Sequence, residues 1–144
     1  MAAPDRIERE IDLANSPEVV WRALTTAEGL GTWFGTHARI DLRPGGQAHV
    51  TWSEDDQATL DILLVDPPHR FAFTWATHGL PPGDPRRTHV EFTLEPIAAG
   101  TRLRVTESGF AQLPDGTAQR AYETNRQGWR SELAELATYL NDAA

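Results

Sequence analysis

A single long amphipathic helix near the C-terminus constrains the fold of this chain more than any other feature. Between Thr117 and Leu140, large apolar residues recur at helical spacing: Tyr122, Trp129, Leu133, Leu136 and Leu140. Thr117 follows a Pro-Asp-Gly turn and is a candidate N-cap. The other positions carry charged or polar residues that suit solvent, Glu132 among them. The apolar stripe must therefore be buried against another element.

Most of the remaining chain has the patterns of β-strands. Ile7, Ile11 and Leu13 alternate with acidic residues, as expected of a strand with one buried face, and Arg9 interrupts that face. Short turns rich in Gly, Pro or Asp separate most of the later apolar runs, and a longer loop is predicted over 79–85. The further strands are predicted at 37–42, 47–53, 58–65, 70–76, 88–94 and 101–108.

Two short helices are predicted between the first strand and the second. Ser16 and Pro17 supply an N-cap and a first helical residue for a helix that runs to about Leu24. Thr26 caps a second short helix that ends at Phe34. Sequential strands joined by tight turns form an antiparallel sheet. The prediction is therefore an α+β class, with one domain over 1–144 and the long helix packed on one face of the sheet.

Charge and composition argue against several classes of function. The formal net charge is −8 and the isoelectric point is about 5.0, whereas nucleic acids and anionic membranes attract basic surfaces. The chain has no cysteine, which excludes disulfides and thiolate metal sites. No apolar run is long enough to cross a bilayer and no export signal begins the sequence, so a cytoplasmic location is expected.

Glu107 is the most informative polar residue. Strand alternation places it on the same face as Leu103 and Val105, toward the long helix. A carboxylate there loses its hydration and needs hydrogen-bond donors. Two interpretations remain open. Glu107 is either an anchor or acid/base group for a ligand, or a structural residue that is satisfied by water, an arginine or a tryptophan N–H.

Aromatic residues are expected to gather between the helix and the sheet. They are Trp33, Phe34, Phe73, Trp75, Phe110, Tyr122 and Trp129, and Trp52 joins them if its strand has the matching register. If the rings leave a gap, they line a site for a small molecule; if they interlock, they are only core. Asn125 and Arg126 flank the apolar stripe, and an inward Arg126 could pair with Glu107 or hold an anionic group of a ligand.

The remaining residue types do not support metal or nucleophilic chemistry. The histidines at 37, 49, 69, 78 and 89 lack ligand spacing such as HExxH, so neither a metal site nor a cofactor is predicted. His37 lies near the expected mouth of the pocket, but a surface histidine is the better interpretation. No serine has a G-x-S-x-G context, and no glycine-rich phosphate loop is present.

Several motifs, in order along nearly the whole chain, resemble the homologues of the heat-shock protein 90 ATPase activator. They are Ile11-Asp12-Leu13, the stretch 16–24, Trp33-Phe34, the stretch 43–46, Phe73-Thr74-Trp75, the stretches 100–103 and 106–110, and Gly128-Trp129. That family belongs to the START-like superfamily (SRPBCC, the birch-pollen-allergen fold). In its helix-grip fold a curved antiparallel sheet wraps around a C-terminal helix and often encloses a cavity for an apolar ligand. The resemblance implies this fold, a pocket and a link to the stress response, but no reaction.

Three functions remain open from the sequence. The first is a non-catalytic START-like domain, monomeric or homodimeric, that binds a small hydrophobic or aromatic molecule between sheet and helix. The second is an enzyme of the cyclase or hydratase type that uses Glu107 with Tyr122 or a histidine as acid and base. The third is an interaction module for a chaperone or a regulator, which predicts an exposed apolar patch. The eukaryotic activator has an additional N-terminal domain that engages its chaperone, and this sequence does not include it, so chaperone activation is the weaker expectation.

Overall fold

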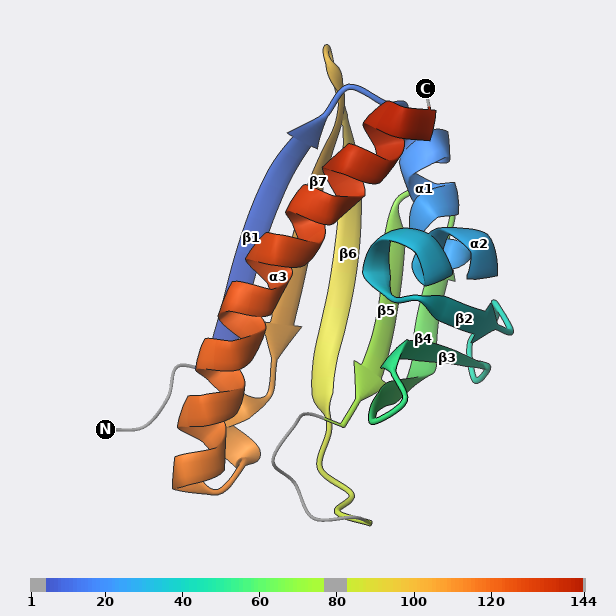
Figure 1. Ribbon diagram of the computed structural model, residues 1–144. Helices are drawn as coiled ribbons and strands as arrows, with labels where there is room; N and C mark the ends of the chain where they lie inside the picture. The colour runs from blue at the N-terminus through green and yellow to red at the C-terminus, as the bar shows by residue number, and fades with distance from the viewer. Residues whose placement is uncertain (1–4, 77–82, 144) are drawn as a thin grey trace.

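A computed structural model describes residues 5–76 and 83–143 and shows the predicted α+β fold, in which a curved seven-stranded antiparallel sheet holds a long helix on one face (Figure 1). The strands are β1 (Arg6–Leu13), β2 (His37–Ile40), β3 (Gln47–Ser53), β4 (Asp56–Asp66), β5 (Arg70–Trp75), β6 (Thr88–Ile97) and β7 (Gly100–Ser108). The helices are α1 (Pro17–Thr25), α2 (Ala27–Gly29), the π-helix η1 (Leu30–Phe34), the short 3-10 helix η2 (Phe110–Gln112) and α3 (Asp115–Ala143). Part of the predicted loop, 79–82, lies outside the described residues, as does the N-terminal segment 1–4.

The strand order is β1-β7-β6-β5-β4-β3-β2, and every neighbouring pair is antiparallel. The meander from β2 to β7 follows the predicted succession of hairpins. The first strand pairs with the last, so that Ile7 lies opposite Glu107. Sequence periodicity shows that a segment is a strand, but it does not show which strand it pairs with.

The two predicted short helices are confirmed, and local capping explains their boundaries. The side chain of Ser16 accepts a hydrogen bond from the backbone N–H of Val19 at the start of α1. Thr26 caps the backbone N–H of Gly29 at 3.0 Å, and α2 continues directly into η1. As a result, Phe34 at the end of η1 stacks on Trp129 of α3.

The long helix α3 begins at Asp115, so Thr117 lies in its first turn and the prediction that Thr117 is the N-cap is wrong. The carbonyl of Pro114 accepts the backbone N–H of Ala118 at 2.7 Å and starts the helix earlier. The predicted stripe faces the sheet: Trp129, Leu133, Leu136 and Leu140 are buried. Tyr122 is only half-buried.

The core fills the space between α3 and the concave face of the sheet. Its largest fully buried side chains include Phe71, Phe73 and Leu103 from the sheet and Leu136 from α3. Alternation along β7 is confirmed, because Leu103, Val105 and Glu107 are all fully buried. A carboxylate thus shares the buried face of the sheet with aliphatic and aromatic residues.

We expect the substitution Gly29→Ala to destabilise the protein, because α2 lies so close to α1 that a Cβ at Gly29 would overlap the backbone of Ala23. The φ of −62° at Gly29 suits any residue, so the close approach alone requires glycine. The carbonyl of Ala23 also accepts the indole N–H of Trp33 at 2.7 Å. The free energy of unfolding in urea should fall by about 1–3 kcal/mol.

Gly128→Ala is the matched control for that substitution. A Cβ at Gly128, in the middle of α3, meets no atom within 4 Å. Alanine is the better helix former, so this variant should gain about 0.5–1 kcal/mol of unfolding free energy. Equal changes of the same sign in both variants would contradict the role given to the contact between α1 and α2.

Candidate functional site

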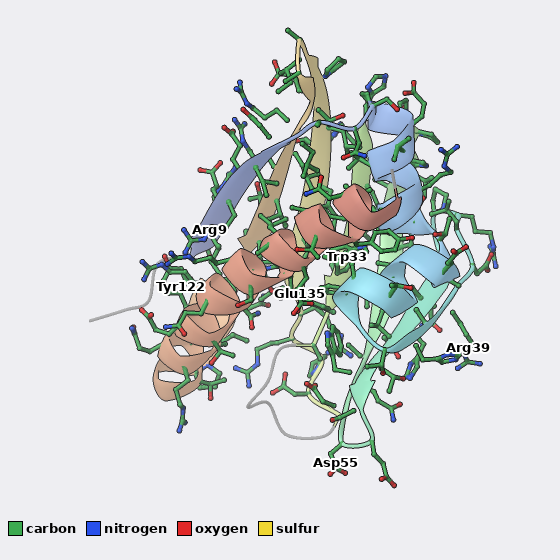
Figure 2. The ribbon with its side chains drawn as sticks, turned by 45° about the horizontal axis from the view of Figure 1, so that its top comes forward. Arg9, Trp33, Arg39, Asp55, Tyr122 and Glu135 are labelled. Atoms are coloured by element: carbon green, nitrogen blue, oxygen red, sulfur yellow. The ribbon has the colours of Figure 1, made fainter. Side chains whose placement is uncertain are left out.

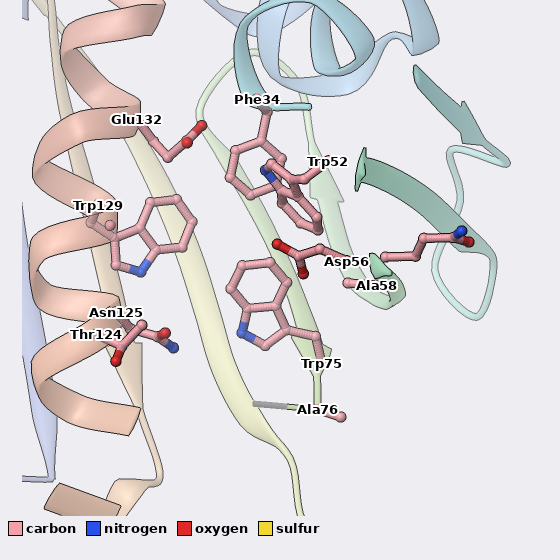
Figure 3. A pocket seen from close by; sticks show the side chains of 12 residues that line it. Phe34, Trp52, Asp56, Ala58, Trp75, Ala76, Thr124, Asn125, Trp129 and Glu132 are labelled. Atoms are coloured by element: carbon pink, nitrogen blue, oxygen red, sulfur yellow. The ribbon is translucent and has the colours of Figure 1, made fainter. Parts of the chain in front are cut away.

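A hollow of about 370 Å³ lies between α3 and the strands β3, β4 and β5 (Figure 3). Its lining residues are Phe34, Trp52, Asp56, Gln57, Ala58, Trp75, Ala76, Thr124, Asn125, Gly128, Trp129 and Glu132. A volume of this size falls in the range of sites for small organic molecules. The side chains of the helix and the sheet therefore leave a space between them at this end of the fold.

Four aromatic rings form most of the apolar wall. Phe34 stacks on Trp75 and on Trp129, with ring centroids 6.0 and 5.8 Å apart and interplanar angles of 17° and 10°. Trp52 meets Phe34 edge to face at 5.0 Å. These are the preferred geometries of aromatic pairs. The rings support one another and remain at the border of the hollow.

Trp52 joins the aromatic group, as the sequence analysis allowed. The pairing between β3 and β4 shifts register between Thr51 and Ser53, so Trp52 lies in a β-bulge. Bulges bend a strand and redirect side chains, often beside binding sites. The bulge places a half-buried indole opposite Trp75, with ring centroids 6.4 Å apart.

Glu107 lies beneath two of these rings and is fully buried. The indole N–H groups of Trp75 and Trp129 donate to its carboxylate at 2.9 and 2.8 Å. The Thr88 hydroxyl donates at 2.5 Å, and the Asn125 amide lies 3.1 Å from both carboxylate oxygens. An indole N–H can only donate, so a carboxylate, which only accepts, suits this set of donors.

Tryptophan N–H groups satisfy Glu107, as the structural interpretation expects. No arginine or histidine in the described part of the chain contacts its carboxylate, and Glu107 does not line the hollow. Its four donors come from β5, β6 and α3. Glu107 therefore fixes the orientation of the two indoles that border the hollow.

Glu132 is the lining residue that sequence reasoning placed wrongly. It was assigned to the solvent face of the helix, but it follows Asn125 and Trp129 at helical spacing and projects from α3 toward Phe34 (Figure 3). Its Oε2 atom is buried and has no hydrogen-bond partner among the described residues. Burial, together with the nearby charge of Glu135, raises the pKa of Glu132 to about 8.

The structure separates the remaining predicted residues from the hollow. Phe73 lies under Trp75 at a centroid distance of 5.3 Å and belongs to the core. Phe110 and Tyr122 pack against each other at 5.7 Å. Figure 2 shows Tyr122 well away from Trp33. These three predicted site residues are therefore parts of the core and its margin.

Trp33 and Arg126 also lie outside the hollow. Trp33 packs on Phe34 and borders a second hollow, on the other side of η1. Arg126 is exposed and lies 3.7 Å from the carboxylate of Glu123, so the prediction of an inward Arg126 that pairs with Glu107 is wrong. Asn125, the other candidate on this flank, is the residue that points inward.

The described residues contain no group of three or more His, Asp or Glu side chains that could hold a metal ion. Within 5–76 and 83–143, no helix combines the length and apolarity that crossing a membrane requires. His37 is exposed at the start of β2 and does not line the hollow.

A curved antiparallel sheet that grips a C-terminal helix, with two short helices after the first strand, defines a START-like helix-grip protein. Residues 14–141 match the family described as activator of Hsp90 ATPase homolog 1-like protein. The chain belongs to this family. Among curated proteins the chain has no match.

Solved structures share the fold over almost the entire chain. Protein MLL2253 from Mesorhizobium loti is 28% identical, with 96% of this chain and 98% of that chain covered and a TM-score of 0.81. DynU16, a protein in the dynemicin biosynthetic locus, is 25% identical with a TM-score of 0.79; the match covers 96% of this chain and 48% of that chain. The Aha1 dimer from Colwellia psychrerythraea is 23% identical, with 94% and 95% covered and a TM-score of 0.75.

Replacing Glu107 by glutamine should destabilise the protein strongly although the side chains have nearly the same shape. The glutamine loses the charge and turns an NH₂ group toward groups that are themselves donors. We expect Glu107→Gln to lower the free energy of unfolding in urea by about 2–4 kcal/mol. Glu91→Gln is the control, because its partner Arg70 is largely exposed and such pairs contribute little. Similar losses in both variants would contradict the importance of the buried carboxylate.

The raised pKa of Glu132 predicts a pH dependence of stability. A carboxyl group whose pKa rises from 4.5 to about 8 on folding holds more protons when folded, so stability falls as pH increases through this interval. The variant Glu132→Gln does not titrate and should lose less unfolding free energy than the wild type between about pH 5 and pH 8. Urea denaturation at several pH values measures this difference, and parallel curves for the two proteins would exclude it.

Proposed function

We propose that this protein binds a small, mainly apolar or aromatic molecule in the hollow between α3 and strands β3 to β5. The observation that carries the proposal is the aromatic border of the hollow, where four rings surround about 370 Å³. A mostly apolar cavity with a few polar groups is the usual form of a small-molecule site. Asn125 and Glu132 are polar groups that could orient a ligand there.

Gly128 gives independent support. A glycine within a long helix costs about 0.5–1 kcal/mol relative to alanine. A Cβ at this position would meet nothing within 4 Å, so packing against neighbours does not require a glycine. Gly128 lines the hollow, and any larger side chain there would occupy the space. Gly128 thus lowers the stability of α3 at a position that borders the open space of the hollow.

The arrangement supports binding better than the acid/base chemistry considered from the sequence. A catalytic pair must reach one common point in the site. Neither Glu107 nor Tyr122 lines the hollow, and both oxygens of Glu107 accept hydrogen bonds from the protein. Glu107 and Tyr122, the acid and base considered for a cyclase or hydratase, therefore cannot both reach a substrate bound in the hollow.

An interaction module for a chaperone or regulator receives less support. Among the described residues, the exposed large hydrophobic side chains are Leu42 and Leu63, at 38% and 49% exposure. Two exposed leucines are normal on a protein surface and do not by themselves indicate a docking patch of several hundred Å². A relative from Colwellia psychrerythraea is a dimer, and a homodimer remains a proposal for this chain beside the monomer.

Filling the hollow should weaken ligand binding strongly without unfolding the protein. N-phenyl-1-naphthylamine, an uncharged aromatic compound that becomes fluorescent in apolar surroundings, is the probe. We expect it to bind the wild type and quench tryptophan emission, because three indoles border the hollow. Gly128→Leu places a branched side chain in this space and should weaken binding by about tenfold or more.

Ser131→Leu is the matched control for this experiment, because it adds the same side chain to an exposed position of the same helix. It should bind the probe like the wild type. A thermal unfolding curve confirms that each variant is folded. Equal affinity in Gly128→Leu and the wild type, or no binding to any of the three proteins, would count against the proposal.

A further inference from the structure

We propose that the hollow selects an organic cation, of the tertiary or quaternary ammonium type, attached to an aromatic or apolar body. The inference rests on the proposed function, because it names the chemical class of ligand for the same hollow. Three features carry it: the faces and edges of four aromatic rings, a carboxylate oxygen without a partner, and the sign of the charges in the wall.

The aromatic border provides the first feature. A cation near the face of a tryptophan or phenylalanine ring is attracted by the negative potential of that face. Phe34, Trp52 and Trp75 come from three different elements and meet at one side of the hollow, with mutual centroid distances between 5.0 and 6.4 Å. Rings that converge from several elements resemble the aromatic cages that hold alkylated ammonium groups.

Glu107 strengthens this effect from beneath the rings. Its carboxylate accepts the indole N–H of both Trp75 and Trp129, which polarises the two donors. An indole that donates to an anion becomes more electron-rich over its ring. The buried carboxylate therefore acts on a ligand through the two indoles, although it does not itself line the hollow.

Glu132 provides the second feature. Its Oε2 atom is buried without a hydrogen-bond partner among the described residues, at a residue that borders the hollow. A buried polar atom without a partner is unfavourable. An ammonium group that enters the hollow would stabilise the ionised form of this poorly solvated carboxylate by its charge, and a neutral apolar molecule would not.

The charges around Glu132 provide the third feature. Glu107 of β7 lies below the indoles, and Glu135 follows on α3. The parts of η1 and β5 that border the hollow contribute Phe34 and Trp75, which carry no charge. No arginine or histidine belongs to the described lining, and the chain has a formal net charge of −8. The field in the hollow favours a positive ligand.

The same features favour a substituted ammonium group over a primary amine. A primary ammonium ion is compact and strongly hydrated, so moving it from water to an aromatic wall is costly. Alkyl groups on the nitrogen reduce this hydration and increase contact with the rings. Among the described residues of the lining, the buried oxygen without a partner is Oε2 of Glu132, and a single such acceptor does not satisfy three N–H donors.

A pair of probes with the same shape tests the charge directly. The cation is [4-(hydroxymethyl)phenyl]trimethylammonium, and the neutral analogue is 4-tert-butylbenzyl alcohol, in which carbon replaces the charged nitrogen. Neither compound titrates between pH 6 and pH 9. Isothermal titration calorimetry on the full chain should show about tenfold tighter binding of the cation at pH 9.

The pH dependence assigns this preference to Glu132. Because the pKa of Glu132 is raised to about 8, the carboxyl is largely protonated at pH 6 and ionised at pH 9. Affinity for the cation should rise by about tenfold or more over this interval, whereas affinity for the neutral analogue should stay constant. Glu132→Gln should remove the rise and keep the binding of the neutral analogue.

Glu95→Gln is the matched control, since it removes the same charge from an exposed site near the far end of β6. It should behave like the wild type toward both compounds. Equal affinities of the wild type for the two probes at pH 9, or an unchanged rise with pH in Glu132→Gln, would overturn the inference and leave the proposed function standing. If neither probe binds to the wild type although N-phenyl-1-naphthylamine does, the inference fails and the proposed function stands; if none of the three compounds binds, both fail for this hollow.

Discussion

The hydrogen bonds that converge on Glu107 join the sheet to the long helix at one point. A buried carboxylate without a contacting cation is stable only when donors replace the water that it has lost. Here the donors come from β5, β6 and α3. The pairing of β5 and β6 with their neighbours and the rotation of α3 must all be correct before this carboxylate is satisfied. Apolar packing alone does not fix how the helix is oriented on the sheet. The directional hydrogen bonds of Glu107 do fix that orientation.

The hollow follows from this anchor and from what surrounds it. With their N–H groups fixed on Glu107, Trp75 and Trp129 hold their rings at the border of the space. The bulge at Trp52 bends β3. Gly128 has no side chain, so α3 does not fill the space next to it. Phe34 closes the remaining side from η1. The space is therefore kept open by rigid aromatic walls rather than by a gap in poor packing.

Sequence periodicity predicts the elements of this fold well, because burial of one face dictates both the helical stripe and the strand alternation. The inward direction of Glu107 followed from alternation, but its partners depend on strand pairing and helix rotation, which periodicity does not contain. Glu132 was assigned to solvent because a charged residue usually marks the outer face of a helix. That rule fails where a helix borders a hollow instead of a filled core. Phe110 and Tyr122 were grouped with the site because a residue pattern does not show that they pack against each other instead.

The pairing of β1 with β7 has a consequence for how the protein is made. The segment Arg6–Leu13 is synthesised before the other strands, yet its partner Gly100–Ser108 is synthesised only after the rest of the sheet. Until then the growing chain exposes apolar strand faces, and α3, which covers them, is synthesised after all seven strands. Contacts between such distant segments slow folding. We therefore expect the sheet to close only once β7 and α3 have been synthesised, so its apolar face is open to aggregation until then.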